Sequence, residues 1–175
     1  DITSYKNSKI KSEYNTAYLP TPYYFLYIAK KSLKKLNIDT FNLIDLGCGF
    51  SRPALYFDKH FKIQYTGIDI NINTLTQIKK KNFNLININL RDENKTNTII
   101  HDFFSKDTNH NIFFLSDPFD LNLIKKIFLD TQTKFSFLAI LVNIDLDNDF
   151  FKNQRIVISH NFNKRNISVV RFNSN

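Results

Sequence analysis

The stretch LIDLGCGFSRPALYF, Leu43 to Phe57, holds two of the three glycines in a chain of 175 residues. An apolar run ends at Gly47, and a helix-like segment with Pro53 in its first turn follows Gly49. Glycine adopts positive φ without steric cost and lets a ligand approach the main chain closely. The stretch therefore predicts a strand, a tight turn and a helix, and the turn is either a ligand-binding loop or a simple reversal of the chain.

Outward from this turn, apolar patterns predict alternating strands and helices. Period-two alternation indicates strands, and apolar residues three or four apart indicate helices. The segment 73–90 fits both patterns, since its second half alternates, and we favour one long helix there. We expect helices at 18–37, 52–61, 73–90 and 121–130, and strands at 41–47, 63–70, 97–104, 111–119, 134–144, 154–159 and 167–172.

The order of these elements indicates the fold class. Strands that alternate with helices, followed by a closing hairpin, predict an α/β three-layer sandwich with a mostly parallel sheet and an antiparallel edge. The sequence has no internal repeat, Pro/Gly/Ser-rich linker or change of composition that would divide it. We therefore expect a single domain over 1–175, with a basic N-terminal arm at 1–17 and an N-terminal helix at 18–37.

Composition narrows the class of protein. The chain is 42% apolar, which is typical of a globular protein that needs no disulfide or metal for its core. The one cysteine, Cys48, excludes an internal disulfide, and the four histidines lack ligand-like spacing, so we expect no metal site. No apolar run reaches the length of a membrane span, and no secretory signal pattern is present, so we expect a cytoplasmic protein without a membrane partner.

The formal charge of +8 raises the question of a nucleic-acid partner. Residues 1–36 contain seven Lys against Asp1 and Glu13, which gives this segment a net charge of +5. However, the chain has nineteen Lys and twenty-three Asn overall, and scattered lysines usually form a solvated surface. Composition alone therefore leaves nucleic-acid binding as an alternative.

Two aspartates close to the glycine turn indicate a nucleoside ligand. Asp45 precedes Gly47 by two residues, and Asp69 ends the next strand, twenty residues beyond Gly49. At that position an acidic side chain can accept hydrogen bonds from both hydroxyls of an adenosine ribose. A dinucleotide site is the alternative, but its fingerprint requires a third small residue where this chain has Arg52.

Several motifs resemble those of one enzyme family. DLGCGFSRP, TGIDI, IIHDFF and FFLSDPF resemble successive motifs of class I S-adenosylmethionine-dependent methyltransferases, and the resemblance covers roughly Tyr18 to Val142. It implies a Rossmann-like core at 41–175 with a seven-stranded sheet, and S-adenosylmethionine as cofactor. The upstream YLPTPYYFL is similar to a Pro-Thr-containing segment of one bacterial branch, which implies that Thr21 and Tyr23 close over the carboxylate end of the cofactor.

The resemblance also implies roles for the glycine turn. Gly47, Cys48 and Gly49 would pass beneath the methionine part of the cofactor, and Asp45 would lie near its amino group. The family usually has a third glycine where this chain has Ser51. If that position requires positive φ, serine is sterically strained there.

The remaining cofactor contacts implied by the resemblance follow the second and third strands. Asp69 would bind the ribose hydroxyls, and Ile70 would pack on the adenine. Asp102, expected directly after the third strand, would accept a hydrogen bond from the adenine amine, with Phe103 against the ring.

The stretch SDPFD, Ser116 to Asp120, resembles the Asn/Asp-Pro-Pro-aromatic motif of enzymes that methylate amines. The resemblance implies that Asp117, Pro118 and Phe119 are the catalytic residues, because the motif's polar side chain and a backbone carbonyl accept hydrogen bonds from the target NH₂. The second proline is absent, and a carboxylate replaces the amide that is usual in the branch resembled. An alternative reading is a simple turn, with Asp120 capping the next helix.

Three hypotheses follow. The first is S-adenosylmethionine-dependent methyl transfer to a nitrogen of a protein lysine or small amine, with a nucleobase as the next acceptor. The second is a catalytically silent methyltransferase-like domain that binds a partner or RNA through its basic N-terminal face, and the third is an adenosine-nucleotide or NAD-binding protein. The sequence names neither the methyl acceptor nor the oligomeric state.

Overall fold

The alternating apolar runs on either side of the glycine turn form one seven-stranded sheet. The computed structural model describes residues 20–80, 82–106, 110–117, 120–146, 149–162 and 165–174, so the expected N-terminal arm at 1–17 lies outside the described residues. The strands are β1 (Thr40–Leu46), β2 (Lys62–Asp69), β3 (Asn84–Asn87), β4 (His110–Ser116), β5 (Phe137–Val142), β6 (Arg155–Phe162) and β7 (Arg165–Phe172).

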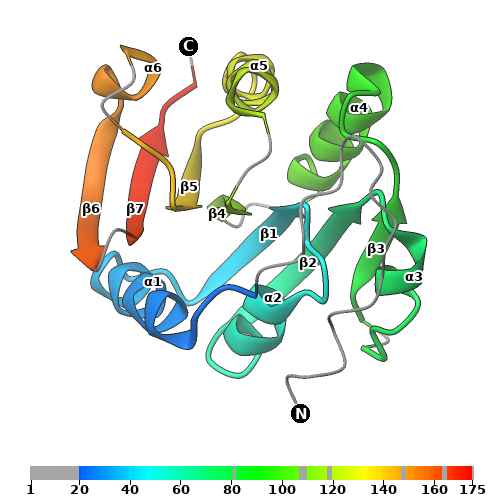
Figure 1. Cartoon of the computed structure of the whole chain (residues 1–175). Coiled ribbons are helices and arrows are strands. Elements are labelled where there is room, and N and C mark those ends of the chain that lie inside the picture. Colours follow the sequence, from blue (N-terminus) through cyan, green and yellow to red (C-terminus); the bar gives the residue numbers. More distant parts are fainter. Residues whose placement is uncertain are drawn as a thin grey trace.

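The strand order is β3-β2-β1-β4-β5-β7-β6 (Figure 1). The first five strands of this order are parallel, and β7 runs antiparallel to both β5 and β6. This arrangement confirms the predicted mostly parallel sheet with an antiparallel C-terminal hairpin. The chain reverses direction across the sheet between β1 and β4, which is where α/β proteins bind ligands.

Helices cover both faces of the sheet, as the three-layer prediction requires. The helices are α1 (Tyr23–Lys35), α2 (Arg52–Phe57), α3 (Ile72–Leu75), α4 (Glu93–Phe104), α5 (Leu121–Gln132) and α6 (Asp149–Lys152). Alternation along β1 divides the core: Phe41 and Leu43 pack with residues of α1 and α2, whereas Ile44 and Leu46 pack with residues of α4 and α5. β5 is buried along its whole length, as its continuous apolar run predicts.

The N-terminal helix is shorter than its predicted range of 18–37. It begins after Pro22, which fixes its own φ and has no N–H to leave unpaired. It ends in a Schellman motif, in which Asn37 takes a φ of 57° and the Ile38 N–H donates to the Leu33 carbonyl at 3.0 Å. Apolar residues at helical spacing bury the inner face of α1 against the sheet.

The prediction of one long helix at 73–90 is wrong. The structure has the single turn α3 there and then the strand β3, which pairs in parallel with β2 from Asn84 to Asn87. β3 lies at the edge of the sheet and is only partly buried. Asparagine and apolar residues alternate in its sequence, which is typical of such a strand. The prediction gave more weight to apolar residues that lie at helical spacing by chance.

The prediction of a strand at 97–104 is also wrong, because this segment forms the last two turns of α4. The Asp92 carboxylate accepts a hydrogen bond from the Lys95 N–H and so caps the helix. The buried residues Thr96, Ile100, Phe103 and Phe104 recur at helical spacing, so the dense apolar run is one face of a helix. No helix among the described residues combines the length and the apolar character that crossing a lipid bilayer requires.

Candidate functional site

The loop after β1 lies against the carboxyl end of β2. The N–H groups of Gly47 and Cys48 both donate to the Ile68 carbonyl, at 2.8 and 3.1 Å. Gly47 and Gly49 have positive φ values of 77° and 50°, which explains why the sequence places glycine at both positions. The loop is therefore held close to the end of the neighbouring strand.

Asp69, the last residue of β2, is bonded to this loop. One carboxylate oxygen accepts from the Gly49 N–H at 2.8 Å, and the other accepts from the Asn71 N–H at 2.7 Å. Each oxygen has two lone pairs, and one on each is unused by these bonds. Asp69 and the glycine turn, which sequence spacing assigned to one site, are thus in direct contact, and the carboxylate can still accept two hydroxyl groups.

Asp45 is buried beneath the loop and shares a hydrogen-bond network. The Tyr65 hydroxyl donates to Ser51 Oγ at 2.8 Å and reaches Asp45 Oδ2 at 3.3 Å. Burial raises the pKa of Asp45 to about 8, an effect that the Tyr65 hydroxyl partly offsets and the Asp69 carboxylate increases. Asp45 is therefore mostly neutral at pH 7 unless a positively charged group lies next to it.

Ser51, where the family resembled usually has a third glycine, takes a positive φ. It is fully buried with φ of 53° and ψ of 34°, in the left-handed region that costs L-residues steric strain. The hydrogen bond from Tyr65 holds its hydroxyl in place. The backbone strain that the sequence suggested for Ser51 is therefore present, and the hydrogen bond from Tyr65 compensates part of it.

Substitutions at Ser51 should reveal this strain. Both Ser51→Gly and Ser51→Ala remove the hydroxyl, but only glycine relieves the left-handed backbone. We expect the glycine variant to be more stable than the alanine variant by about 1 kcal/mol, the reverse of the usual order in helices. Urea unfolding of the two proteins measures this difference, and an alanine variant as stable as the glycine variant would show that the position is unstrained.

Cys48 of the loop and Gly67 of β2 pack closely together. A Cβ atom on Gly67 would lie 2.8 Å from Cys48 Sγ and 2.5 Å from the Tyr65 hydroxyl, so this glycine is needed for packing. Burial, and then the Asp45 and Asp69 carboxylates, raise the pKa of the Cys48 thiol far above its ordinary value. The thiol is therefore no nucleophile at neutral pH, and its role is to fill space.

The start of α1 lies beside the start of α2. Arg52 Nη1 donates to the Thr21 carbonyl at 3.3 Å, and its guanidinium lies 5.2 Å from the centre of the Tyr23 ring. Thr21 is buried and Tyr23 is exposed. Both residues are thus next to the glycine loop, but only Tyr23 presents its side chain to solvent there.

The expectation that Asp102 and Phe103 lie at the end of the third strand is wrong. Both lie in the last turn of α4, which begins near the carboxyl end of β3 and leads back toward the start of β4. Phe103 is buried in the core on that face of the sheet, and Asp102 is exposed on the outer side of the helix. Neither residue follows a strand, so neither is proposed as a contact to the cofactor.

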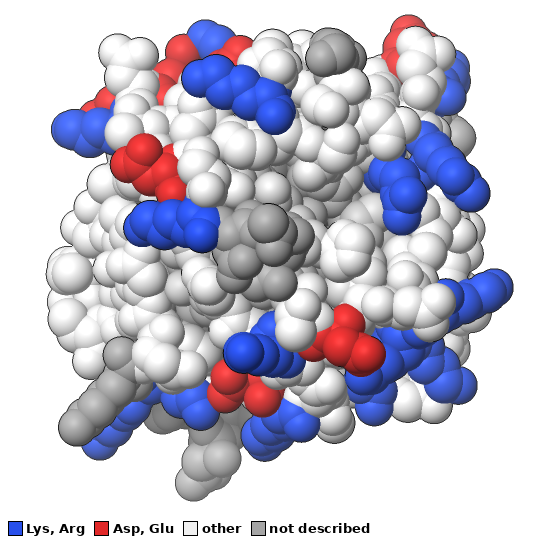
Figure 2. Space-filling view, turned by 180° about the vertical axis from the view of Figure 1, so that it is seen from behind, with Lys and Arg blue, Asp and Glu red and all other residues white. Residues whose placement is uncertain are grey.

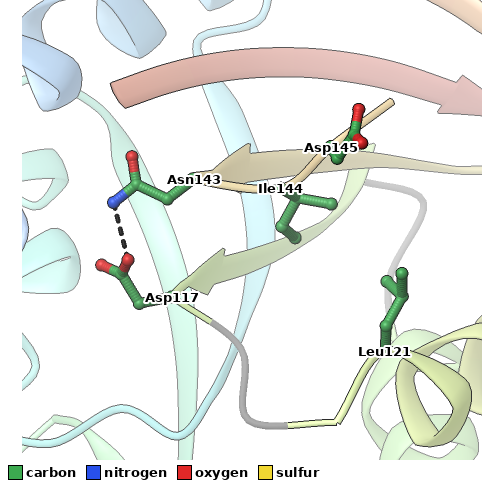
Figure 3. A pocket seen from close by; sticks show the side chains of 5 residues that line it. All are labelled: Asp117, Leu121, Asn143, Ile144 and Asp145. Atoms are coloured by element: carbon green, nitrogen blue, oxygen red, sulfur yellow. Dashed lines mark hydrogen bonds between the residues drawn. The ribbon is translucent and has the colours of Figure 1, made fainter. Parts of the chain in front are cut away.

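A pocket lies at the carboxyl ends of β4 and β5 (Figure 3). It has a volume of about 280 Å³ and is lined by Asp117, Leu121, Asn143, Ile144 and Asp145. Figure 3 shows Asp117 and Asn143 pointing toward each other, and Asn143 Nδ2 donates to Asp117 Oδ1 at 2.7 Å. Asp117, which the sequence predicts to face the substrate, therefore lies in a pocket. The other two residues of the motif, Pro118 and Phe119, lie outside the described residues.

Three strands hold Asp117 in place. Asn143 follows β5, and its own Oδ1 accepts from the Asn166 N–H of β7 at 3.2 Å. Arg165 of β7 lies 3.9 Å from the second oxygen of Asp117. Asp117 and Asn143 have φ values of 50° and 57°, and such left-handed residues are frequent at functional sites.

The alternative interpretation of Asp120 as a helix cap is also confirmed. Its carboxylate accepts hydrogen bonds from the N–H groups of Asn122 and Leu123 and caps α5.

Three residues of the site were missed by sequence reasoning. Tyr65 lies two residues before Gly67 on the same face of β2, and this spacing alone could have indicated that its ring covers the glycine. Asn87 donates to the carbonyls of Asp69 and Ile70, at 3.0 and 2.8 Å, and it belongs to the strand that was taken for a helix. Asn143 was visible only as a polar residue directly after the buried run of β5.

Comparison with known proteins places this geometry in a fold family. No family model and no curated protein matches the sequence. Among solved structures, the chain is similar to yhhF of Escherichia coli, a proposed methyltransferase, with 13% identity, a TM-score of 0.63, and coverage of 90% of this chain and 89% of that one. The chain has the fold of S-adenosylmethionine-dependent methyltransferases.

Two further structures support this assignment of the fold. An RNA methyltransferase from Salinibacter ruber, in complex with S-adenosyl-L-homocysteine, has 12% identity and a TM-score of 0.60, covering 90% of this chain and 95% of that one. A ribosomal protein L11 methylase from Lactobacillus delbrueckii subsp. bulgaricus has 9% identity and a TM-score of 0.58, covering 88% of this chain and 81% of that one.

Proposed function

We propose that the protein is an S-adenosylmethionine-dependent methyltransferase that acts on a nitrogen of a protein lysine or a small amine. The cofactor would lie across the ends of β1 and β2, with its ribose on Asp69 and its methionine part over Gly47 and Gly49. Ile70, whose side chain is half exposed beside Asp69, would pack on the adenine, and Tyr23 would cover the other end of the cofactor. The fold of the neighbouring structures supports this proposal.

One observation carries it: the site has two neighbouring carboxylates and no basic partner for them. Asp45 and Asp69 interact with each other electrostatically, and across the described ranges neither forms an ion pair with Lys or Arg. Asp45, which is mostly neutral in the absence of a neighbouring cation, would ionise next to one, so the site favours a positively charged nucleoside over the anionic pyrophosphate of a dinucleotide. S-adenosylmethionine has a positively charged sulfonium and a positively charged amino group, so the residues present fit it.

The acceptor pocket suits an amine. When bound, the cofactor supplies an electrophilic methyl group, and the protein must orient a nitrogen lone pair toward it. The Asp117 carboxylate, fixed by Asn143, can accept an N–H of the acceptor and attract a cationic amine. The side chains of Leu121 and Ile144 would hold an aliphatic stem and exclude water. Positioning of this kind supplies much of the rate in a direct displacement.

Calorimetry with S-adenosylmethionine and S-adenosylhomocysteine tests the proposal. We expect both to bind the purified protein, and we expect NAD and ATP to show no competition. Absence of binding by either ligand, in protein shown by circular dichroism to be folded, would rule out the proposed function.

Asp117→Ala should separate binding from chemistry. We expect the variant to bind S-adenosylhomocysteine as the parent does, because Asp117 directly follows β4 and does not belong to the glycine loop. We expect transfer of a radiolabelled methyl group to a panel of amines and lysine peptides to fall at least a hundredfold, as is typical when a general acid–base or positioning group is lost. Asp117→Asn, which keeps the oxygen acceptor but not the charge, is the matched control. Undiminished transfer by the alanine variant would exclude Asp117 from the acceptor site.

A further inference from the structure

Exposed aromatic side chains are concentrated on one surface of the molecule. Among the residues that the structure describes, the four exposed large aromatic side chains all lie on α1 or at the end of β6. Tyr23, Tyr24 and Tyr27 are 62%, 44% and 42% exposed, and Phe162 is 53% exposed. Single exposed rings are common on protein surfaces, but four exposed rings gathered on one surface indicate a binding surface.

Basic side chains lie among these rings. Lys30 Nζ and Lys31 Nζ lie 5.2 and 4.8 Å from the centre of the Tyr27 ring. The segments that form α1, β6 and β7 contain four Lys and three Arg and no Asp or Glu. In Figure 2, basic groups outnumber acidic ones along the right-hand margin, which corresponds after the turn of the view to the left of Figure 1, where α1 and β6 lie.

Contacts between α1 and β6 make these residues one continuous surface. The Tyr24 ring lies 5.3 Å from the Phe162 ring, and its hydroxyl is 2.9 Å from His160 Nε2. We call Tyr23, Tyr24, Tyr27, Lys30, Lys31 and Phe162 the aromatic–lysine surface. Its residues at spacings of three and four follow one side of α1, a helix about 20 Å long.

This surface reaches the candidate active site at both ends. Tyr23 contacts Arg52 at the start of α2, directly after the glycine loop. Phe162 of β6 pairs with Arg165 of β7, and Arg165 lies 3.9 Å from Asp117 in the acceptor pocket. A ligand bound along α1 would therefore lie close to the glycine loop at one end and to the acceptor pocket at the other.

We propose that the aromatic–lysine surface binds single-stranded RNA. Lysines without acidic neighbours attract a polyanion, and exposed rings stack on unpaired bases, a combination typical of proteins that bind single strands. The alternative anionic partners fit less well. An acidic protein segment offers no aromatic bases to stack on the four rings, and a membrane surface needs a continuous apolar helix face, which α1 buries against the sheet. The inference goes beyond the proposed methyl transfer and does not depend on it.

Fluorescence anisotropy with a labelled twelve-nucleotide oligouridine tests the proposal. We expect binding that weakens as salt rises from 50 to 200 mM, because lysines displace counterions from phosphates. Tyr27→Ala and Phe162→Ala should each weaken binding about fivefold or more, the effect expected when one base–aromatic stack is lost. Tyr27→Phe should retain the affinity, since stacking needs the ring and not the hydroxyl.

Leu129→Ala is the matched control, because Leu129 is 50% exposed on α5, away from this surface. It should bind oligouridine as the parent does, and so should Asp69→Ala, whose carboxylate is not part of the surface. Unchanged affinity in a Tyr27→Ala/Phe162→Ala double variant would overturn the proposal. Tighter binding of an oligoglutamate peptide or of phosphatidylglycerol vesicles would also overturn it, in favour of an acidic protein or a membrane.

Discussion

Asp69→Ala is expected to abolish measurable binding of S-adenosylhomocysteine. The side chain would lose two hydrogen bonds between a carboxylate and the ribose hydroxyls, and bonds to a charged group contribute about 1.5–3 kcal/mol each. It would also lose its bonds to the N–H groups of Gly49 and Asn71, which hold the glycine loop against the end of β2. Calorimetry should therefore show affinity at least a hundredfold weaker than that of the parent protein.

Two further variants make this experiment specific. Asp69→Asn keeps one oxygen acceptor and should lose only part of the affinity, about tenfold, which is one hydrogen bond to a charged group. Asp58→Ala removes a carboxylate that is paired with Lys80 at the far end of α2, and it should leave binding unchanged. If Asp69→Ala bound the ligand as tightly as the parent, the assignment of Asp69 to the ribose would be wrong.

The part of the site that sequence predicted well is the part built from consecutive residues. Gly47, Gly49 and Asp69 belong to one strand–turn–helix–strand unit, so their spacing in the chain fixes their spacing in the fold. Asp45 of β1 lies opposite Gly67 in the parallel pairing with β2. Asp69, two residues further along β2, therefore lies at the level of the loop that follows β1. For this reason spacing alone could assign the second aspartate to the loop that it contacts in the structure.

The errors come from segments in which local pattern and tertiary context disagree. β3 is a four-residue edge strand, and its pairing with β2 is a contact that no local pattern displays. In α4 the pairs Ile99–Ile100 and Phe103–Phe104 give an apolar density typical of a buried strand, although their spacing of four is helical. Asp102 was assigned a role because of that error.

Contacts between distant strands were beyond sequence reasoning for a different reason. The bond from Asn143 to Asp117 depends on the register between β4 and β5, in which Ser116 lies opposite Val142. The contact of Asn166 with Asn143 depends in turn on the antiparallel register of β7. A single sequence does not specify register across strands separated by twenty or more residues, so Asn143 could be found only in the structure.

Asp45 predicts a large dependence of stability on pH. Burial raises its pKa to about 8 in the folded protein, from an ordinary value of 3.8. Between these two values the folded state keeps a proton that the unfolded state releases, so the free energy of unfolding falls as pH rises through this window. A shift of this size corresponds to a loss on the order of 5 kcal/mol between pH 4 and pH 8. Urea unfolding over this range measures the slope.

Asp45→Asn should remove this dependence, because the amide stays neutral and can still bond to Tyr65. We expect the variant and the parent to be similarly stable at pH 4 and the variant to be more stable by several kcal/mol at pH 8. His60 and His101, whose pKa values are lowered mainly by desolvation, act in the opposite direction, but they are common to both proteins and cancel in the difference. Asp39→Asn is the matched control, since the Asp39 side chain is 70% exposed and its removal should leave the slope unchanged. A parent and an Asp45→Asn variant with the same slope would show that the buried carboxyl group ionises as readily as in water, which would contradict the raised pKa of Asp45.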